Sequence, residues 1–234
     1  MKIPVTIVSI RQVTPTVKAL RLDLGRRPFS FLPGQWVDCY LTPDGHGDVA
    51  GFSMTSSPLT EGTIDLAVKL VGDNAVTHHL HHRARVGDVI YVEGGSGDFF
   101  YRREMGDSLV LIGGGIGITP LISILRYVDE AASGVRVSLF YSASTPSELL
   151  FRDELSELAT RNSAIACLLT VTRNTDEPWD GPVGRIDAET LNEAGLDLGA
   201  LFYVCGPPPM IRDVLSMLRD LGVPDSRVKY EQWW

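Results

Sequence analysis

The chain has 234 residues, a length that fits one large domain or two small ones. Hydrophobic residues make up 44% and charged residues 21%, which excludes disorder, a collagen-like repeat or a coiled coil as a description of the whole chain. The net charge of −8 argues against nucleic acid or an anionic membrane as a partner, because both require a basic protein face.

The three cysteines (Cys39, Cys167 and Cys205) lie far apart and form no C-x-x-C motif. They are too few for a disulfide framework, a zinc site or a four-thiolate iron–sulfur cluster within this sequence. The N-terminal segment lacks the long apolar centre of a secretory signal. The uncharged stretch 108–125 contains glycines and Pro120, which predict a strand, a turn and a helix start in place of a membrane span. We therefore expect a cytoplasmic protein.

The first hundred residues have the pattern of short β-strands. Alternating apolar and polar residues predict strands over 20–24 and 64–68, and further strands fit 35–41 and 88–93. One helix is expected over about 75–84. Short strands so closely spaced predict a small antiparallel barrel.

The second half alternates strands with helices. Apolar, β-branched runs predict strands over 108–112, 135–141, 165–171 and 201–204. The helices are expected near 119–131, 147–161 and 207–221. This alternation predicts a parallel, doubly wound sheet. The expected fold class is thus two-domain β plus α/β, with a barrel domain over 1–103 and an α/β domain with an aromatic tail over 104–234.

Two segments stand where open α/β sheets bind ligands, at the carboxyl ends of strands. Gly113-Gly-Gly-Ile-Gly-Ile-Thr-Pro120 follows a strand and opens a helix, so its backbone could approach a diphosphate. Its spacing differs from G-x-G-x-x-G, and packing alone is the competing explanation of its glycines. Cys205-Gly-Pro-Pro-Pro-Met210 forms a rigid turn after the last predicted strand. The Cys205 thiol has the competing interpretation of a small buried hydrophobic group.

A third segment, Ala50-Gly-Phe-Ser-Met-Thr-Ser-Ser-Pro58, combines an aromatic ring with a cluster of hydroxyls. With these three segments in this order, the chain resembles the ferredoxin–NADP⁺ reductase superfamily. Within the superfamily it is most similar to the oxidoreductase NAD-binding-domain-containing proteins. Phe52-Ser53 and Ser56-Ser57-Pro58 match the flavin motif of the superfamily, and the ending Tyr230-Glu-Gln-Trp-Trp234 resembles its acidic and aromatic tails.

The resemblance implies FAD as cofactor and gives roles to residues of the first domain. Phe52 would lie against the flavin ring, and Ser53 would hydrogen-bond near its reactive N5 edge. The helix start over Gly72–Thr77 would hold the diphosphate, with Thr77 as a possible cap of that helix. The residues implied for FAD are Phe52, Ser53, Lys69, Ala75, Val76, Thr77, Trp233 and Trp234. One departure is Ala50, which stands where the superfamily has an arginine that pairs with the flavin phosphate.

The resemblance also implies NAD(P)H as hydride donor, bound by the second domain. The residues expected at this nucleotide are Gly113, Gly114, Gly115, Gly117, Thr119, Pro120, Ser142, Arg173, Gly206, Pro207 and Met210. Ser53, Cys205 and Glu231 are the expected catalytic residues. The preference between NADH and NADPH stays open, because Ser142–Ser144 carry neither an acid nor a cation, whereas Arg152 and Arg173 could reach the nucleotide.

The expected function is that of an FAD-dependent NAD(P)H oxidoreductase. Its electrons would pass to a separate acceptor such as a ferredoxin, a flavodoxin or an oxygenase component. The alternatives are a flavin reductase that uses flavin as a diffusible substrate, which the missing arginine favours, and a non-catalytic nucleotide-binding subunit. His78 and His82 share a helix face, but no acidic or thiol partner stands beside them, so no metal is expected.

Overall fold

A computed structural model describes the chain except for residues 45–46, 132–133, 174–175 and 233–234. The described residues form two compact units. The first unit comprises Met1–Tyr101 together with Ile122–Tyr127, and the second comprises Arg102–Leu121 and Val128–Trp234. The main segment of the first unit therefore ends at Tyr101, whereas the sequence analysis expected the domain boundary after residue 103. The unit also includes residues 122–127, which lie in the middle of a later helix.

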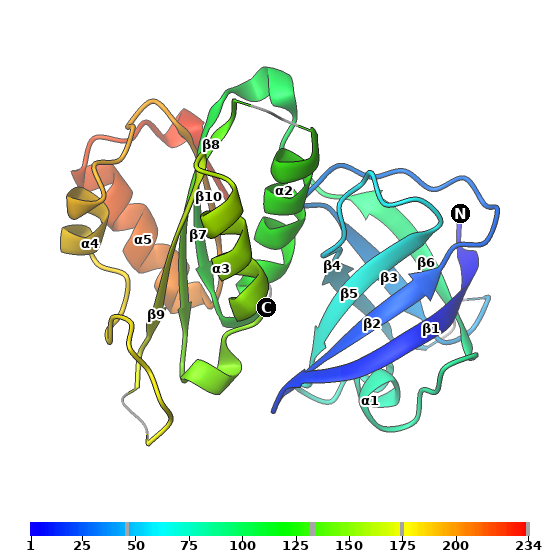
Figure 1. Cartoon of the computed structure of the whole chain (residues 1–234). Coiled ribbons are helices and arrows are strands. Elements are labelled where there is room, and N and C mark those ends of the chain that lie inside the picture. Colours follow the sequence, from blue (N-terminus) through cyan, green and yellow to red (C-terminus); the bar gives the residue numbers. More distant parts are fainter. Residues whose placement is uncertain (45–46, 132–133, 174–175, 233–234) are drawn as a thin grey trace. The chain divides into compact units, whose positions relative to one another are not determined.

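The first unit is built on an antiparallel six-stranded sheet (Figure 1). The strand order is β4-β3-β6-β1-β2-β5. An isolated antiparallel bridge between Met54 and Leu66 joins the two edges, so the sheet is barrel-like, as expected. The strands are β1 (Ile3–Thr14), β2 (Val17–Asp23), β3 (Trp36–Tyr40), β4 (Val49–Ser53), β5 (Thr63–Lys69) and β6 (Val89–Ser96).

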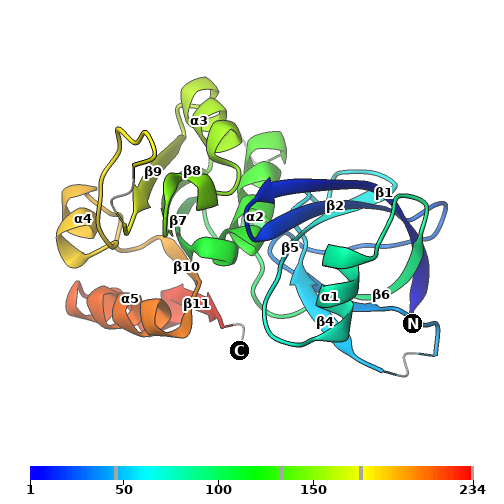
Figure 2. The same ribbon diagram turned by 90° about the horizontal axis from the view of Figure 1, so that it is seen from below.

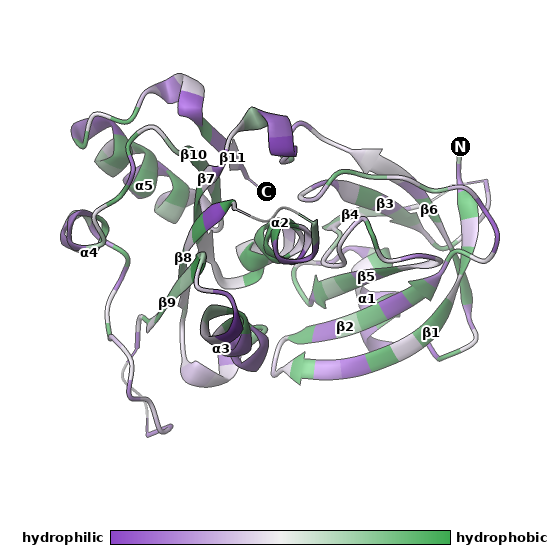
Figure 3. Cartoon of the chain, turned by 45° about the horizontal axis from the view of Figure 1, so that its top comes forward, coloured by the Kyte–Doolittle hydropathy of each residue, from purple (hydrophilic) through white to green (hydrophobic). Residues whose placement is uncertain are grey.

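Period-two alternation explains why these segments are strands. In β2, Leu20 and Leu22 are buried while Arg21 and Asp23 are exposed, because successive side chains point to opposite faces. Figure 3 shows the same alternation of hydrophilic and hydrophobic colour along β1 and β2. The inward side chains form one core, which includes Val5, Ile7, Leu20, Leu22, Val37, Ile64, Leu66, Val68 and Val92.

Helix α1 (Ala75–His82) lies at one end of the barrel (Figures 1 and 2). Its Val76 and Leu80 are buried in the barrel core. The N-cap is Asn74, whose side chain accepts hydrogen bonds from the backbone N–H groups of Val76 and Thr77. The suggestion that Thr77 caps this helix is therefore wrong. Asn74 stands one position before the helix, where a side-chain oxygen can reach the free N–H groups, whereas Thr77 lies inside the first turn.

The second unit contains a parallel five-stranded sheet in the order β11-β10-β7-β8-β9, which confirms the doubly wound α/β architecture. Helices α2 and α3 lie on one face of the sheet, and α4 and α5 lie on the other (Figures 1 and 2). The strands are β7 (Ser108–Gly114), β8 (Arg136–Ala143), β9 (Ile165–Val171), β10 (Leu201–Cys205) and β11 (Val228–Glu231). The helices are α2 (Ile118–Ala131), α3 (Arg152–Arg161), α4 (Ala188–Glu193) and α5 (Pro208–Asp220).

Four short 3-10 turns complete the described structure, at Arg103–Met105, Gly115–Gly117, Pro146–Glu148 and Asp225–Arg227. One of them corrects the helix expected over 147–161. The chain makes a 3-10 turn there, and Phe151 then adopts a left-handed φ of 59°, so α3 begins only at Arg152. Helix α4 and strand β11 were not expected from the sequence. No helix in the described part of the chain is both long and apolar enough to cross a membrane.

The N-cap of α1 gives a direct test. Asn74→Ala should lower the free energy of unfolding by about 1 kcal/mol, because two N–H groups lose their acceptor. Thr77→Val, which changes a side chain of similar shape inside the first turn, should cost clearly less. Urea unfolding of the full chain measures both changes, and equal losses for the two variants would contradict the assignment of Asn74 as the cap.

Candidate functional site

Strand β4 carries two of the residues expected to contact a flavin. Phe52 pairs with Val37, and Ser53 pairs with Trp36, in the antiparallel ladder between β3 and β4. Phe52 is 8% exposed and belongs to the barrel core, and Ser53 is 4% exposed. Ala50 is partly buried and packs against the same core. The strand register therefore fixes the positions of both expected residues.

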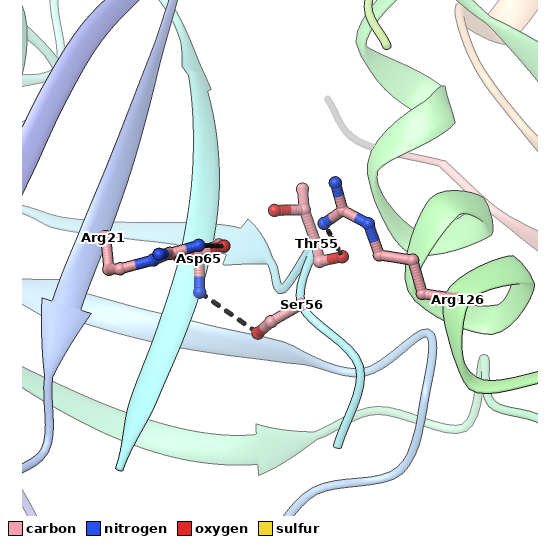
Figure 4. A network of polar contacts seen from close by, with 5 residues as sticks. All are labelled: Arg21, Thr55, Ser56, Asp65 and Arg126. Carbon is pink, nitrogen blue, oxygen red and sulfur yellow. Dashed lines mark hydrogen bonds and ion pairs between the residues drawn. The ribbon is translucent and has the colours of Figure 1, made fainter. Parts of the chain in front are cut away.

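The turn that follows β4 is held by a network of hydrogen bonds within the first unit (Figure 4). The Thr55 N–H donates to the carbonyl of Asp65 at 2.8 Å, and the Asp65 N–H donates to Oγ of Ser56 at 3.1 Å. Nη1 of Arg126 donates to the carbonyl of Thr55 at 2.6 Å. The Asp65 carboxylate in turn accepts two bonds from Arg21, at 2.7 and 2.8 Å, and raises the pKa of that guanidinium. This buried turn of hydroxyl residues is thus fixed by backbone and charged contacts together.

The start of α1 was expected to bind a diphosphate through its free N–H groups. In the structure these groups already have side-chain acceptors. Oδ2 of Asp48 accepts from the Ala75 N–H at 2.8 Å, and Oδ1 of Asn74 accepts from Val76 at 3.0 Å and from Thr77 at 3.1 Å. A carboxylate from a distant part of the chain therefore stands at this helix end.

Two of the histidines of α1, His78 and His81, bond to backbone carbonyls. Nε2 of His78 lies 3.0 Å from the carbonyl oxygen of Gly72, and Nε2 of His81 lies 2.8 Å from that of Val68. Burial lowers the pKa of His81. Among the described residues no group of three His, Cys, Asp or Glu side chains could hold a metal ion. Lys69, also expected near the flavin, ends β5 and is partly buried.

In the second unit, the glycine-rich turn and the Cys205 loop follow adjacent parallel strands. Because β7 pairs with β10, Gly113 lies opposite Cys205. A Cβ at Gly114 would overlap the sulfur of Met210, and a Cβ at Gly117 would overlap the carbonyl of Cys205. Close packing therefore explains these two glycines. Gly115 differs from them, because its φ is +55° and a Cβ there would meet nothing within 4 Å.

Tyr141 holds the turn at Gly115 through its hydroxyl, a role that the sequence analysis did not assign to it. Its buried hydroxyl donates to the carbonyl of Gly115 at 3.1 Å and accepts from the Leu150 N–H at 3.2 Å. Burial raises the pKa of this phenol, so the hydroxyl keeps its proton. Tyr141 ends an apolar run that predicted a buried strand, so it resembled an ordinary core residue, and only the fold brings its hydroxyl to the turn.

The two helices that start at this edge of the sheet differ in the N–H groups they present. The 3-10 turn before α2 has Gly114 as its N-cap and no side-chain cap. Thr119, expected at the nucleotide, is buried and donates its hydroxyl to the carbonyl of Ile116 at 2.9 Å. Helix α5 begins at Pro208 with Pro207 as its N-cap, and prolines have no N–H. The α2 start is therefore the better position for phosphate, and the α5 start suits an uncharged group.

Cys205 and Glu231, both expected to be catalytic, are brought together by the parallel pairing of β10 with β11. Cys205 is 1% exposed. Burial and the charge of Glu231 raise the pKa of its thiol well above the usual value. The thiol is therefore protonated at neutral pH and is not a nucleophile.

Ser142 and Arg173 lie at the carboxyl ends of neighbouring strands. Ser142 is buried in β8, and the Arg173 N–H donates to the carbonyl of Ser144 at 3.0 Å. The guanidinium of Arg152, the other cation considered for the nucleotide, lies 5.0 Å from the ring centre of Trp179. Of the two arginines, Arg173 is thus the one linked to the end of β8. Trp233 and Trp234, expected at the flavin, lie outside the described residues.

Comparison with known proteins identifies both units. The model of the oxidoreductase FAD-binding domain matches residues 4–101, and the model of the oxidoreductase NAD-binding domain matches residues 111–216. These matches confirm FAD and a nicotinamide nucleotide as the ligands of the fold. They also confirm the resemblance drawn from the sequence.

Three similar proteins illustrate the relationship. The oxidoreductase NAD-binding domain-containing protein 1 of Danio rerio is 36% identical over 239 residues, which cover 94% of this chain and 87% of the relative. The reductase component of propane 2-monooxygenase from Rhodococcus jostii (strain RHA1) is 32% identical, covering 96% of this chain and 61% of the relative. The solved structure of the ferredoxin reductase in carbazole 1,9a-dioxygenase is 27% identical with a TM-score of 0.86, covering 100% of this chain and 70% of that one.

The hydroxyl of Tyr141 provides a test of the glycine turn. Tyr141→Phe should weaken NAD(P)H binding roughly fivefold, because the Gly115 carbonyl and the Leu150 N–H lose a buried partner. FAD affinity should not change. The control is Thr170→Val, which removes another buried hydroxyl with two carbonyl acceptors, those of Pro182 and Gly184. Equal losses of nucleotide affinity in both variants, measured by titration, would assign the effect to general destabilisation.

The buried thiol of Cys205 provides a second test. In the folded protein at about pH 8, iodoacetamide should leave Cys205 unmodified, because the thiolate that reacts is not formed. Unfolding in urea should expose it to rapid labelling. Mass spectrometry of the digested protein follows each cysteine separately, including the partly buried Cys167, whose pKa burial raises to about 11. Fast labelling of Cys205 in the folded state would contradict its protonated, buried state.

Proposed function

Because the chain belongs to the ferredoxin–NADP⁺ reductase family of FAD- and NAD-binding oxidoreductases, we propose that it oxidises NAD(P)H and passes the electrons through FAD to a separate acceptor. The observation that carries this proposal is that the chain matches both domain models and contains the glycine turn and the Cys205 loop. The glycine turn and the Cys205 loop meet at the carboxyl edge between β7 and β10, where the strand order of the sheet reverses. Open α/β sheets bind nucleotides at such a switch point.

Bound FAD would supply the redox chemistry, since flavin accepts a hydride and can release electrons singly. The first unit fits the two ends of this cofactor differently. Phe52 and Ser53 stand together on β4 and are fixed by its register, as a ring-binding position requires. At the α1 start, the Asp48 carboxylate on the Ala75 N–H shows that this helix end accepts an anionic oxygen. A flavin phosphate would take the place of that carboxylate.

The second unit would orient the nucleotide through the starts of α2 and α5, which differ in the N–H groups that they offer. The diphosphate would lie at the open turn around Gly115, where backbone N–H groups and the helix dipole favour an anion. The nicotinamide would lie at the proline-rich start of α5, which offers few donors. Met210 and Cys205 would border it with neutral sulfur atoms.

Cys205 and Glu231 would act without forming a covalent bond to the substrate. The Glu231 charge helps to keep the proton on Sγ of Cys205, so the thiol presents a neutral, polarisable surface. Alignment of the reacting carbon is the main contribution that such a surface makes to hydride transfer. The carboxylate of Glu231 would favour positive charge on the oxidised nicotinamide.

The acceptor would be a separate protein or a part of the protein outside these 234 residues. Three cysteines cannot hold a four-thiolate cluster within this sequence. One similar protein is the reductase component of propane 2-monooxygenase, and another is a ferredoxin reductase in a dioxygenase. A ferredoxin, a flavodoxin or an oxygenase component is the class of acceptor we propose.

A second candidate is an NAD(P)H:flavin reductase, in which flavin is a diffusible substrate. Two observations favour it. Ala50 replaces the arginine of the flavin motif, and side-chain acceptors already occupy the N–H groups at the start of α1. Both features would shorten the time that flavin stays bound.

The proposal is tested by steady-state oxidation of NADH and of NADPH with ferricyanide as acceptor and FAD added in excess. We expect turnover that depends on FAD and saturates with at least one nucleotide. An absorption spectrum of the purified protein separates the candidates: bound flavin supports the first, and activity only with added flavin supports the second. If neither nucleotide is oxidised at saturating FAD, both reductase assignments fail, and a non-catalytic nucleotide-binding subunit becomes the better description.

A further inference from the structure

The start of α1 is occupied by a carboxylate that does not belong to the helix. Asp48 lies 27 residues before Ala75 in the sequence, yet its Oδ2 is 2.8 Å from the Ala75 N–H. The segment is held there by a further bond, from Nδ2 of Asn74 to the carbonyl of Val49 at 2.8 Å. The beginning of β4 is thus tied to the helix start at two points.

A capping role alone explains Asn74 but not Asp48. Asn74 satisfies the Val76 and Thr77 N–H groups as an ordinary local cap. Asp48 satisfies one further N–H and adds a full negative charge at the positive end of the helix dipole. Among the described residues Asp48 makes no ion pair. Its contact with the helix is the hydrogen bond from the Ala75 N–H. An anionic ligand at this helix end would meet a like charge and an occupied donor.

We propose that Asp48 is a built-in anion that occupies the flavin-phosphate position of α1 and must be displaced before a flavin phosphate can bind. This inference rests on the proposed function, because it takes the first unit as the flavin site. Ala50, two residues further along, has no charge to offset the carboxylate. Asp48 therefore sets both the affinity for phosphorylated flavins and the preference between them and riboflavin, which has no phosphate.

The test compares three proteins in flavin titrations followed by fluorescence: the full chain, Asp48→Asn and Asp73→Asn. Asp73 is the matched control, because it lies directly before the cap Asn74 and makes no hydrogen bond or ion pair within the described chain. Asp48→Asn should lower the dissociation constant for FAD about fivefold, since a charge at the helix end is removed. Its dissociation constant for riboflavin should stay unchanged. Asp73→Asn should change the FAD constant less than twofold.

Stability provides a second readout with the opposite sign. Asp48→Ala removes both the charge and the acceptor, so the flavin-free protein should melt at a lower temperature while its FAD affinity rises. A side chain that merely supports the barrel would lose affinity and stability together. Circular dichroism of each variant verifies that the fold is retained, and Asp48→Asn, which keeps an oxygen acceptor, serves if Asp48→Ala does not fold.

The outcomes separate this inference from the proposed function. If the full chain binds FAD and oxidises NAD(P)H, but Asp48→Asn binds FAD no more tightly, the proposed displacement is wrong and the reductase assignment stands. An equal gain of affinity for riboflavin would also overturn it, because the effect would then not involve phosphate. If the full chain binds neither flavin and oxidises neither nucleotide, the proposed function fails, and this inference fails with it.

Discussion

The nucleotide-binding unit depends on one close approach of two backbones. The turn after β7 and the loop after β10 come so near each other that Gly117 has no room for a side chain beside the carbonyl of Cys205. Glycine costs conformational entropy on folding, up to about 1 kcal/mol relative to alanine in a regular element. Here it allows two helix starts to open side by side at one edge of the sheet. The rest of the candidate nucleotide site follows from that placement.

Three helix starts of this chain show three different uses of the free N–H groups that every helix leaves at its beginning. At α2 the turn has no side-chain cap, so its donors stay available to a ligand. At α5 the prolines at the N-cap and the first two helical positions leave few donors. At α1 they are taken by Asn74 and Asp48. The chain has a net charge of −8. What each helix start can bind therefore depends more on its free backbone N–H groups than on positive side chains.

Local pattern was sufficient for most of the fold. Alternation identified β2 and β5, and continuous apolar runs identified the strands of the parallel sheet, because both patterns follow directly from which faces are buried. Strand β11 was missed because its four residues form an edge strand with no buried side chain, and its position depends on pairing with β10. The start of α3 was misplaced because the left-handed backbone at Phe151 is not encoded by a glycine.

The segments of the candidate site can be read from the sequence where a motif carries them, and they are hidden where contacts join distant parts of the chain. The glycine turn, the Cys205 loop and the Phe52-Ser53 pair belong to the first kind, and their roles in binding stay predictions. The hydroxyl of Tyr141 belongs to the second kind, because its partners at Gly115 and Leu150 are set by the fold. The same holds for the protonation of Cys205, which results from burial and from a neighbouring strand that the sequence did not reveal.

The capping of α1 also affects how stable the barrel is when no flavin is bound. A barrel whose helix end has no capping acceptor of its own loses stability whenever the cofactor departs, because a missing N-cap acceptor costs about 0.5–2 kcal/mol. Asn74 and Asp48 supply these acceptors from within the chain, so the first unit keeps its helix without a ligand. The same contacts reduce the gain that a phosphate can make on binding. If the proposed displacement of Asp48 holds, a stable flavin-free barrel and a loosely held flavin would be two consequences of one set of hydrogen bonds.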